Sequence, residues 1–424
     1  MRIAILALFL AQSVSDQLQQ RTGQSIPKVV EQPDTFTLPP GVQLTDQVAP
    51  RDAVAIALWN NKALRADLAN LDVSRSDLIE ARQFRNPGFS ALLPVGPKPF
   101  EFLLTWPIEE LWQRGPRIRA ARLNVDAVGT GLVQNGLNLI RDVRLAHSDL
   151  WLAGQRTRTL QESANLRARI ATLTERRRDA GDATGLDVRL AALDGRSTQE
   201  LAQRSLGEIE VVRSRLRLLM GLRDDRRPLV AVLDGSNQTA VPDLPELLET
   251  AMSSRPDLRA AELNVEVAAE RGKWQRSRLL ALLAPQLSTK GVGTAGIRTG
   301  PGLSMDVPAF NRNQGAISRA DAEVMRAGDL YASVRDRVEQ EVVESHERVL
   351  QAQASLANLQ QQVRSKVDEA IRITERSYQN GDVSLLTVLE ATRQRYDIAL
   401  REIEAEAALY RARAELERAI GRSL

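Results

Sequence analysis

The sequence RRRDAGDATGLDV at residues 176–188 has a near-copy, RSYQNGDVSLLTV, at residues 376–388. In each copy a glycine, which can adopt the left-handed conformation that ends a helix, precedes an aspartate that can cap the start of the next helix. Both stretches therefore predict a sharp turn between two helices, made twice by one chain. The identical residues lie 200 positions apart and are Arg176, Gly181, Asp182, Leu186 and Val188, with Arg376, Gly381, Asp382, Leu386 and Val388.

The repetition extends over most of the chain. NKALRADLANLDV at residues 61–73 parallels RPDLRAAELNVEV at residues 255–267, and the offset between matching positions stays between 194 and 200. Self-similarity at one long period indicates structural repeats. We assign the first repeat to residues 44–221 and the second to residues 247–424, joined by a linker at 222–246 that is rich in turn-forming residues.

Each repeat contains a long segment with helical periodicity. Mostly small and medium side chains recur at alternating spacings of three and four from Val143 to Thr174, and again 199 positions later from Val342 to Ile373. The same offset pairs the charged Arg167 with Lys366. Such a seam indicates close helix packing, as in coiled coils. The sequence predicts helical hairpins at about 116–221 and about 316–421, with the two quoted stretches as their tips.

Ahead of each long helix the period changes from helix to strand. In KPFEFLLTWP, at residues 98–107, aromatic and aliphatic side chains alternate with Glu101 and Thr105. This alternation predicts a strand between an apolar and a polar environment. Four strands are predicted, at about 87–95, 99–107, 285–293 and 299–307. The residues expected to face a membrane are Phe100, Phe102, Leu104, Trp106, Leu303, Met305 and Val307.

These strands have about nine residues each, which is near the lower limit for a tilted strand that spans a bilayer. A soluble antiparallel hairpin that caps the helices is the alternative. Four strands cannot close a barrel alone, so a spanning barrel would require several chains.

The N-terminal sequence MRIAILALFLAQSVSDQ is typical of a secretory signal peptide, with one arginine, a short apolar run and small residues at Ser13 and Ser15. We predict a signal peptide at residues 1–15 and an extended N-terminal segment at 16–43; a buried first helix is the alternative. No later segment approaches 18 consecutive apolar residues, so no membrane-spanning helix is predicted.

Composition and motifs argue against several classes of protein. The 57 Lys and Arg residues and the 54 Asp and Glu residues are interspersed, so the chain lacks the basic stripe of a nucleic-acid-binding protein. GVGTAG at 291–296 matches a dinucleotide fingerprint, but the IRTGPGLS after it is not helical in character. His147 and His346 occupy matching positions with no further His or Cys ligand, so we expect packed or solvated histidines. We predict no catalytic residues, no cofactor and no metal site, and hence no enzyme.

The repeats and their motifs resemble the TolC-type outer-membrane factors of Gram-negative bacteria, the outer-membrane efflux protein family. The resemblance rests on the tips AGDATGLDV and NGDVSLLTVLEA, on VPAFNRNQGAISRADAEV at 307–324, and on ALYRARAELERAIG at 408–421. It covers about residues 44–421, and the FNRNQG segment favours the branch that serves heavy-metal cation efflux.

The fold implied by this resemblance is mainly α with a small β part: a tandem repeat of long antiparallel helical hairpins plus four β-strands per chain. Three chains would form a twelve-stranded β-barrel in the outer-membrane lipid and an α-helical barrel in the periplasm. The implied partners are two further copies in a homotrimer, a periplasmic adaptor (membrane fusion) protein, and an inner-membrane pump of the RND type, with no nucleic acid.

The resemblance also implies roles for particular residues. Asp187 and Glu390 match the acidic positions that narrow the tunnel at its periplasmic mouth, whereas Thr387 stands where a further acidic residue is common. The alternative to such a cation-attracting ring is a closed gate, in which these carboxylates form structural salt bridges with Arg178 or Arg189, both close in sequence. The tip residues expected to bind the adaptor are Gly181, Asp182, Leu186, Val188, Gly381, Asp382, Leu386 and Val388.

We therefore predict a passive exit duct across the periplasm and outer membrane, the channel component of a tripartite efflux system, with heavy-metal cations as the favoured cargo. The alternatives are a soluble coiled-coil scaffold, or the same channel serving drug efflux or type I protein secretion. The sequence leaves the cargo open, because in a tripartite machine specificity would reside mostly in the pump.

Overall fold

A computed structural model describes residues 14–27, 36–93, 100–222, 225–233, 240–278, 284–291, 297–304 and 310–424. The described chain divides into two compact units. The strand-bearing unit comprises Ala66–Val133 and Pro256–Arg337, and the tip-bearing unit comprises Ala11–Arg65, Gln134–Arg255 and Val338–Leu424. Each unit takes segments from both repeats.

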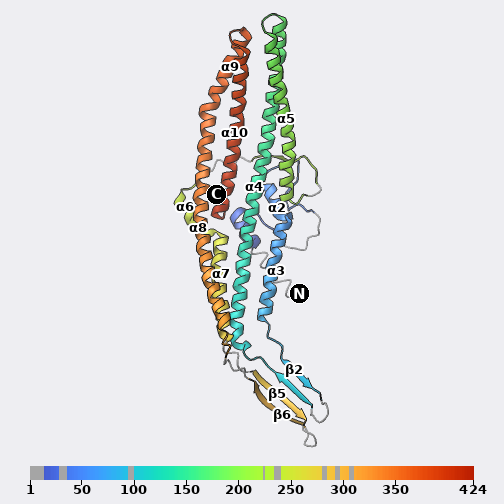
Figure 1. Cartoon of the computed structure of the whole chain (residues 1–424), viewed down its shortest axis with the longest axis vertical. Coiled ribbons are helices and arrows are strands. Elements are labelled where there is room, and N and C mark those ends of the chain that lie inside the picture. Colours follow the sequence, from blue (N-terminus) through green and yellow to red (C-terminus); the bar gives the residue numbers. More distant parts are fainter. Residues whose placement is uncertain are drawn as a thin grey trace. The chain divides into compact units, whose positions relative to one another are not determined.

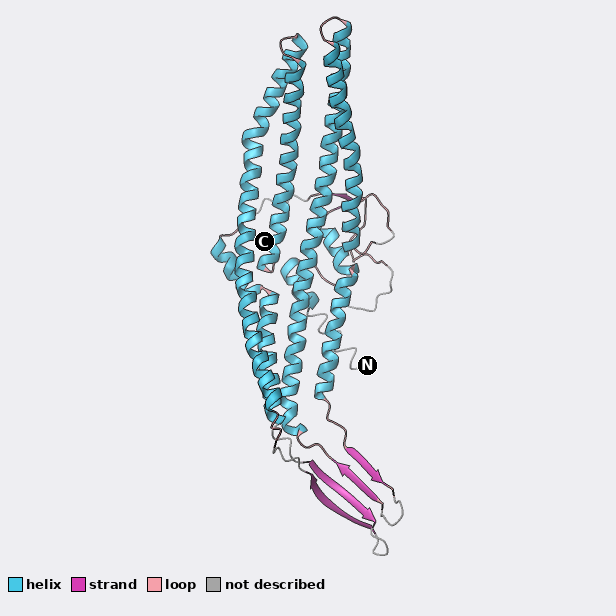
Figure 2. Cartoon of the chain, in the orientation of Figure 1, coloured by secondary structure: helices cyan, strands magenta, loops and turns pink. Residues whose placement is uncertain are grey.

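The order of elements follows the predicted repeat (Figures 1 and 2). Two helices, a strand pair and a long helical hairpin occur in the first half and then again in the second. The bounds in the first half are α2 Pro50–Asn60, α3 Lys62–Arg82, β2 Gly88–Leu92, β3 Glu101–Thr105, α4 Glu110–Asp179 and α5 Gly185–Leu219. Those in the second half are α6 Leu244–Ser254, α7 Pro256–Ser277, β5 Ala284–Gly291, β6 Ile297–Ser304, α8 Gln314–Asn358, the π-helix η4 Leu359–Val363, α9 Arg364–Asn380 and α10 Leu385–Ile420.

The four predicted strands form one antiparallel sheet in the order β2-β3-β5-β6. The pairing Phe89↔Leu104↔Leu287↔Pro301 runs across all four strands and places these side chains on one face. The opposite face carries polar side chains, including the neighbouring pair Glu101↔Lys290. The predicted alternation between an apolar and a polar environment is thus confirmed, because side chains on adjacent strands share a face in register.

The strands of the first pair are shorter than predicted. β2 and β3 have five residues each, whereas β5 and β6 have eight. Among the residues predicted to face a membrane, Phe102, Leu104 and Leu303 lie on the apolar face, exposed by 37%, 39% and 64%. Phe100 and Trp106 flank β3. Met305 and Val307 lie outside the described residues.

The N-terminal segment differs from the extended conformation that we predicted. Residues 14–22 are helical, because Val14 and Leu18 are spaced one helical turn apart and both are buried. The Leu18 side chain fills the space beside Gly136, where an added Cβ would lie 2.8 Å from Leu18 Cδ1. The buried hydroxyl of Ser15 donates a hydrogen bond to the Ile26 carbonyl at 3.1 Å. The predicted signal peptide falls largely on residues 1–13, which lie outside the described residues.

The linker is partly ordered. β4 (Val230–Ala231) within it pairs in parallel with β1 (Gln47–Val48). The predicted end of the linker also shifts, because α6 begins at Leu244, three residues before the predicted start of the second repeat at 247. Its N-terminal turn carries a proline, which suits a first helical turn.

The second long helix contains one extra residue, and η4 accommodates it. His147 matches His346 at an offset of 199, but the triplet TER at 174–176 matches TER at 374–376 at an offset of 200. A π-helical turn is how an α-helix absorbs a single inserted residue, and η4 lies between the two matches. The predicted seam is therefore wrong beyond η4. The inward positions become Val367, Ile371 and Thr374, whereas Lys366, Ala370 and Ile373 are exposed.

Candidate functional site at the hairpin tips

Both tip turns have the same backbone structure. α4 and α9 each end at a glycine with positive φ, +88° at Gly181 and +86° at Gly381. The amide of the following aspartate donates to the carbonyl five residues earlier, Asp182 to Arg177 and Asp382 to Ser377, each at 2.8 Å. This is the Schellman arrangement, in which a left-handed glycine lets two amides satisfy the last carbonyls of a helix. The predicted helix-ending role of the two glycines is confirmed.

The prediction that Asp182 and Asp382 cap the following helices is wrong. The N-cap of α5 is Thr184 and that of α10 is Ser384, each accepting a hydrogen bond from the backbone amide three residues on. The Schellman turn explains the shift, because it uses the residue after the glycine to close the preceding helix. The next helix then begins two residues later.

Asp187 completes a capping box at the start of α5. Its Oδ2 atom accepts hydrogen bonds from the Thr184 amide at 2.9 Å and the Thr184 hydroxyl at 2.7 Å. These bonds, the hydroxyl bond foremost, lower the pKa of the Asp187 carboxyl, because they favour the charged form. Thr387 occupies the matching position in the second tip, so no carboxylate completes the cap of α10.

The four apolar residues predicted to bind the adaptor differ in how far their side chains are exposed. Leu186 and Leu386 are 66% and 72% exposed, which is unusual for large apolar side chains. Val388 is only 3% exposed and belongs to the core beneath the tips, so it is not accessible to a partner. Val188 is half-buried. The two exposed leucines are thus the apolar surface of the tips.

The candidate gate residues are not brought together within one chain. Arg178 pairs with the neighbouring Asp179, whose Oδ1 atom lies 2.6 Å from Arg178 Nη2. Glu390, on the exposed side of α10, accepts a hydrogen bond from Gln394 at 3.3 Å. Within the described part of the chain, neither Arg178 nor Arg189 forms an ion pair with Asp187 or Glu390. Of the two carboxylates, Glu390 is the one that no helix cap engages.

Tyr378 joins the two hairpins at the tips, a role that sequence reasoning missed. Its side chain is 4% exposed and packs in a core with Ile170 of α4, Ala191 of α5 and Val388 of α10. The guanidinium of Arg177 lies 4.6 Å from the centre of the Tyr378 ring, and Arg177 Nη1 donates to the Tyr378 carbonyl at 3.2 Å.

The hydroxyls of Tyr378 and Thr174 are 3.3 Å apart, which adds a hydrogen bond between α9 and α4. The sequence signal that could have pointed to Tyr378 is a difference between the two repeats. Tyr378 stands where the first repeat has Arg178, between two stretches that the repeats share, Thr374–Arg376 and Gly381–Asp382.

The two histidines are packed residues, as predicted. His147 is fully buried, and its Nε2 atom lies 2.8 Å from the Val48 carbonyl oxygen. His346 is 8% exposed, with Nδ1 3.8 Å from a Glu347 oxygen. Among the described residues, no three His, Asp or Glu side chains are placed to hold a metal ion. Nor does that part of the chain contain a helix both long and apolar enough to cross a bilayer.

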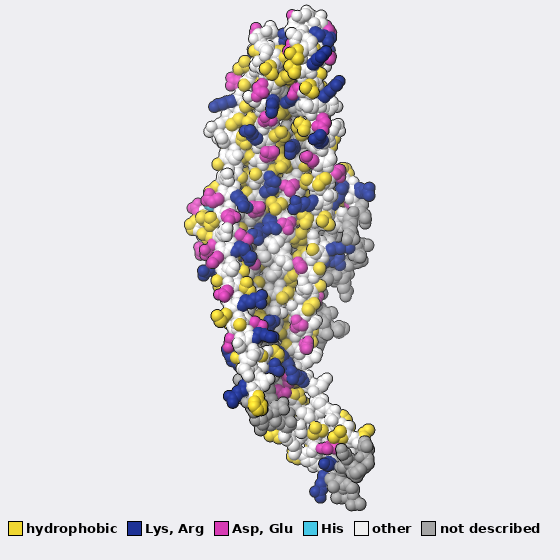
Figure 3. Space-filling view, viewed as in Figure 1, with side chains coloured by type: hydrophobic (Ala, Val, Ile, Leu, Met, Phe, Trp, Pro, Cys, Tyr) yellow, Lys and Arg dark blue, Asp and Glu magenta, His cyan; other side chains and the backbone are white. Residues whose placement is uncertain are grey.

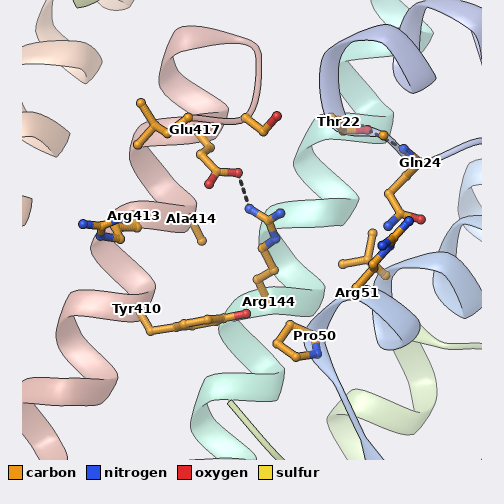
Figure 4. Close-up of a pocket in the computed structure, with 13 residues that line it drawn as sticks. Thr22, Gln24, Pro50, Arg51, Arg144, Tyr410, Arg413, Ala414 and Glu417 are labelled. Atoms are coloured by element: carbon orange, nitrogen blue, oxygen red, sulfur yellow. Dashed lines mark hydrogen bonds and ion pairs between the residues drawn. The ribbon is translucent and has the colours of Figure 1, made fainter. Parts of the chain in front are cut away.

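A cavity of about 300 Å³ lies away from the tips, between the helix at residues 14–22, α2, α4 and the end of α10 (Figure 4). Arg144 and Glu417 form an ion pair across it, and Arg51 lies on its other side. Arg413 in its wall is largely buried, and this burial lowers the pKa of the guanidinium. The lining thus holds three arginines, Arg51, Arg144 and Arg413, together with Glu417.

Comparisons with known proteins agree with this geometry. Residues 247–422 match the family model described as outer membrane efflux protein. The chain is 24% identical over 377 residues to the cobalt-zinc-cadmium resistance protein CzcC of Cupriavidus metallidurans, covering 87% of this chain and 89% of that protein.

Two solved structures share the fold. The outer-membrane channel OprN is 21% identical, with a TM-score of 0.73 over 88% of this chain and 90% of that one. CusC is 17% identical, with a TM-score of 0.73 over 94% of this chain and 98% of that one. The second repeat matches the outer membrane efflux protein family, and over nearly its whole length the chain is similar to TolC-type outer-membrane factors.

Proposed function

We propose that this protein is the outer-membrane exit duct of a tripartite efflux system for divalent heavy-metal cations, working as a homotrimer with a periplasmic adaptor and an inner-membrane pump of the RND type. As an outer membrane efflux protein it lies in the outer membrane, with its helical part in the periplasm. The family is one of channel proteins, and we assign this chain no chemical reaction of its own.

The observation that carries the proposal is the two-faced sheet with open edges. β2 and β6 each pair on one side only among the described residues. Unpaired edges and an exposed apolar face are costly in water. Because the sheet has an even number of antiparallel strands, β6 of one copy and β2 of the next can pair antiparallel. Three copies would close twelve strands, with the apolar face toward lipid and the polar face toward the lumen.

An apolar stripe along α5 supports the association of several copies. Its residues are separated by helical steps of three and four, or by sums of such steps, and are 44% to 73% exposed. A stripe at this spacing is typical of a seam that packs against another helix, and in the trimer that helix would come from a neighbouring copy. The residues are Leu190, Leu193, Leu201, Val211 and Leu218, all of which lie beyond the adaptor-docking Leu186 of the tip.

The tips support docking of an adaptor. Leu186 and Leu386 combine high exposure with rigid, capped turns, and a preformed apolar surface binds a partner at a low cost in conformational entropy. Glu390, three copies of which would surround the trimer axis, is the carboxylate that we propose for the cation-attracting constriction. We propose a lesser electrostatic role for Asp187, because its oxygen is engaged by Thr184.

The cargo is inferred from the relatives. The similar protein of Cupriavidus metallidurans is named for cobalt, zinc and cadmium resistance, and we extend that cargo class to this chain. The test is to delete the gene and measure cell-associated Co, Zn and Cd by elemental mass spectrometry. We expect all three metals to rise, and to fall again when the wild-type gene is restored.

A fluorescent efflux dye and the secreted protein fraction serve as comparisons in the same strains. Accumulation of the dye without the metals would assign the duct to drug efflux. Loss of a secreted protein without metal accumulation would assign it to protein secretion.

A further inference from the structure

Positive charge is concentrated at the helix ends that adjoin the sheet. These ends and the residues beside them are 80–85 at the end of α3, 109–119 at the start of α4, 270–278 at the end of α7 and 310–321 at the start of α8; we call them the junction belt. The junction belt holds eleven Lys and Arg residues against five Asp and Glu residues, whereas the whole chain has 57 against 54. The rest of the chain is therefore net acidic. In Figure 3 Lys and Arg side chains are visible at this end of the helices as well as along the rest of their length.

Part of this charge is neutralised within the belt. Glu110 pairs with Arg85 and Arg117, and Glu270 pairs with Arg119 and Lys273. Asp321 pairs with Arg276. Glu80 and Glu109 form no ion pair among the described residues. Six arginines also have no acidic partner within the described part of the chain. Arg114 is half-buried, and the other five are exposed: Arg82, Arg271, Arg278, Arg312 and Arg319.

Aromatic side chains accompany the unpaired arginines. Phe84, Trp106 and Phe310 are 55%, 56% and 96% exposed. The Arg114 guanidinium lies 4.5 Å from the centre of the Phe84 ring, and that of Arg278 lies 5.9 Å from the centre of the Trp274 ring. Exposed rings beside a membrane-spanning segment are typical of the headgroup layer, where an apolar ring and a charged group are both accommodated.

We propose that the junction belt binds anionic phospholipid headgroups in the periplasmic leaflet of the outer membrane. This inference rests on the proposed function, because it requires the sheet to lie in the bilayer. The apolar face of the sheet would then contact acyl chains, and the belt, which follows directly along the chain, would lie at headgroup depth. A guanidinium offers paired N–H donors that match phosphate oxygens, so the phosphodiester is the group recognised.

The test uses the purified full-length protein in a neutral detergent, titrated with phosphatidylglycerol or with zwitterionic phosphatidylcholine, and follows tryptophan fluorescence. The test variant combines Arg82→Gln, Arg278→Gln and Arg312→Gln. The control variant combines Arg169→Gln, Arg326→Gln and Arg337→Gln, which remove three exposed arginines of α4 and α8 outside the belt. A basic residue near an anionic surface contributes about 1 kcal/mol, a factor of about five.

We expect the test variant to bind phosphatidylglycerol about a hundredfold more weakly than wild type at low salt, and the control variant to bind as wild type does. Replacing the same three belt arginines by lysine should restore most of the binding. Equal affinity for the two lipids, or unchanged binding in the test variant, would overturn the proposal. Weaker binding of phosphatidylglycerol by the control variant would also overturn the proposal, because it would show that binding depends on the overall charge of the protein and not on the junction belt.

Insertion of the wild-type protein into vesicles of phosphatidylcholine and into vesicles of phosphatidylglycerol is measured alongside. If the protein inserts there but shows no preference for phosphatidylglycerol, only the belt proposal fails. If it inserts into neither lipid, the proposed function fails first.

Discussion

Replacement of Tyr378 should release the two hairpin tips from each other. The ring is 4% exposed and its removal leaves a cavity in the tip core, so Tyr378→Ala should cost about 3–5 kcal/mol of local stability, including the contact with Arg177. Tyr378→Phe removes only the hydroxyl near Thr174 and should cost about 1 kcal/mol. The two variants therefore separate packing from hydrogen bonding at one position.

Amide hydrogen exchange in the tip segments measures this cost. A loss of about 1 kcal/mol corresponds to about fivefold faster exchange through local opening, and a loss of 3–5 kcal/mol to more than about a hundredfold. We expect both effects in the last turns of α4 and α9. Tyr331→Ala, in α8 of the strand-bearing unit, is the control and should leave tip exchange unchanged. Tip exchange within a factor of about two of wild type in Tyr378→Ala would refute the assignment of Tyr378 as the link between the hairpins.

Three further predictions follow from the tips and the long helices. Deleting Gln361 within η4 should leave the trimer intact on native electrophoresis, because the π-turn becomes an ordinary α-helical turn and the buried faces of α8 and α9 keep their direction. Deleting Gln161 in α4 should abolish the trimer, because every later residue of that helix is rotated. Replacing Leu186 and Leu386 together by Asp should abolish metal efflux and capture of the adaptor but leave the trimer intact; unchanged efflux would show that these leucines only shape the turns. The hydrogen bonds that lower the pKa of Asp187 stabilise the start of α5 fully above the unfolded pKa of about 3.9, and this contribution is lost as the pH falls through the lower folded value. The protection of the amides there, relative to an unfolded peptide at the same pH, should therefore fall below about pH 4, and Asp187→Asn should remove that pH dependence.

Val388→Asp provides a matched comparison for the leucine variants. Val388 is 3% exposed in the tip core, so an aspartate there buries a charge and should destabilise the tip itself. We expect faster amide exchange around it, in contrast to the two exposed leucines. Equal exchange in the two kinds of variant would contradict the division of the tip into a core and a docking surface.

The tip turns and the sheet were predictable because local chemistry determines them. A glycine with positive φ between two helical patterns leaves little choice of conformation, and alternation along a strand fixes which face is apolar. The caps were not predictable in the same way. Asp182 and Thr184 are both good N-cap residues. Only the Schellman turn decides between them, because it uses the amide of Asp182 to close the end of α4.

Features that depend on distant contacts escaped sequence reasoning. The predicted seam uses one offset of 199 between the repeats on both sides of η4, although the tips, which follow η4, match at an offset of 200. The link between Tyr378 and Arg177 joins residues 201 positions apart in sequence, so no local pattern announces it. Both features lie where the two repeats differ, and a residue-by-residue comparison of the repeats would have pointed to both.

The number of copies in the particle is measured most directly by native mass spectrometry of the protein extracted from the outer membrane in mild detergent. If the open edges of β2 and β6 pair between copies, the particle will contain three chains, each of at most the 46.9 kDa of the full sequence, and will resist dissociation by moderate heat. A single chain that stays monodisperse and folded after the detergent is removed would contradict this pairing, because such a chain could not leave its apolar strands and sheet edges without partners.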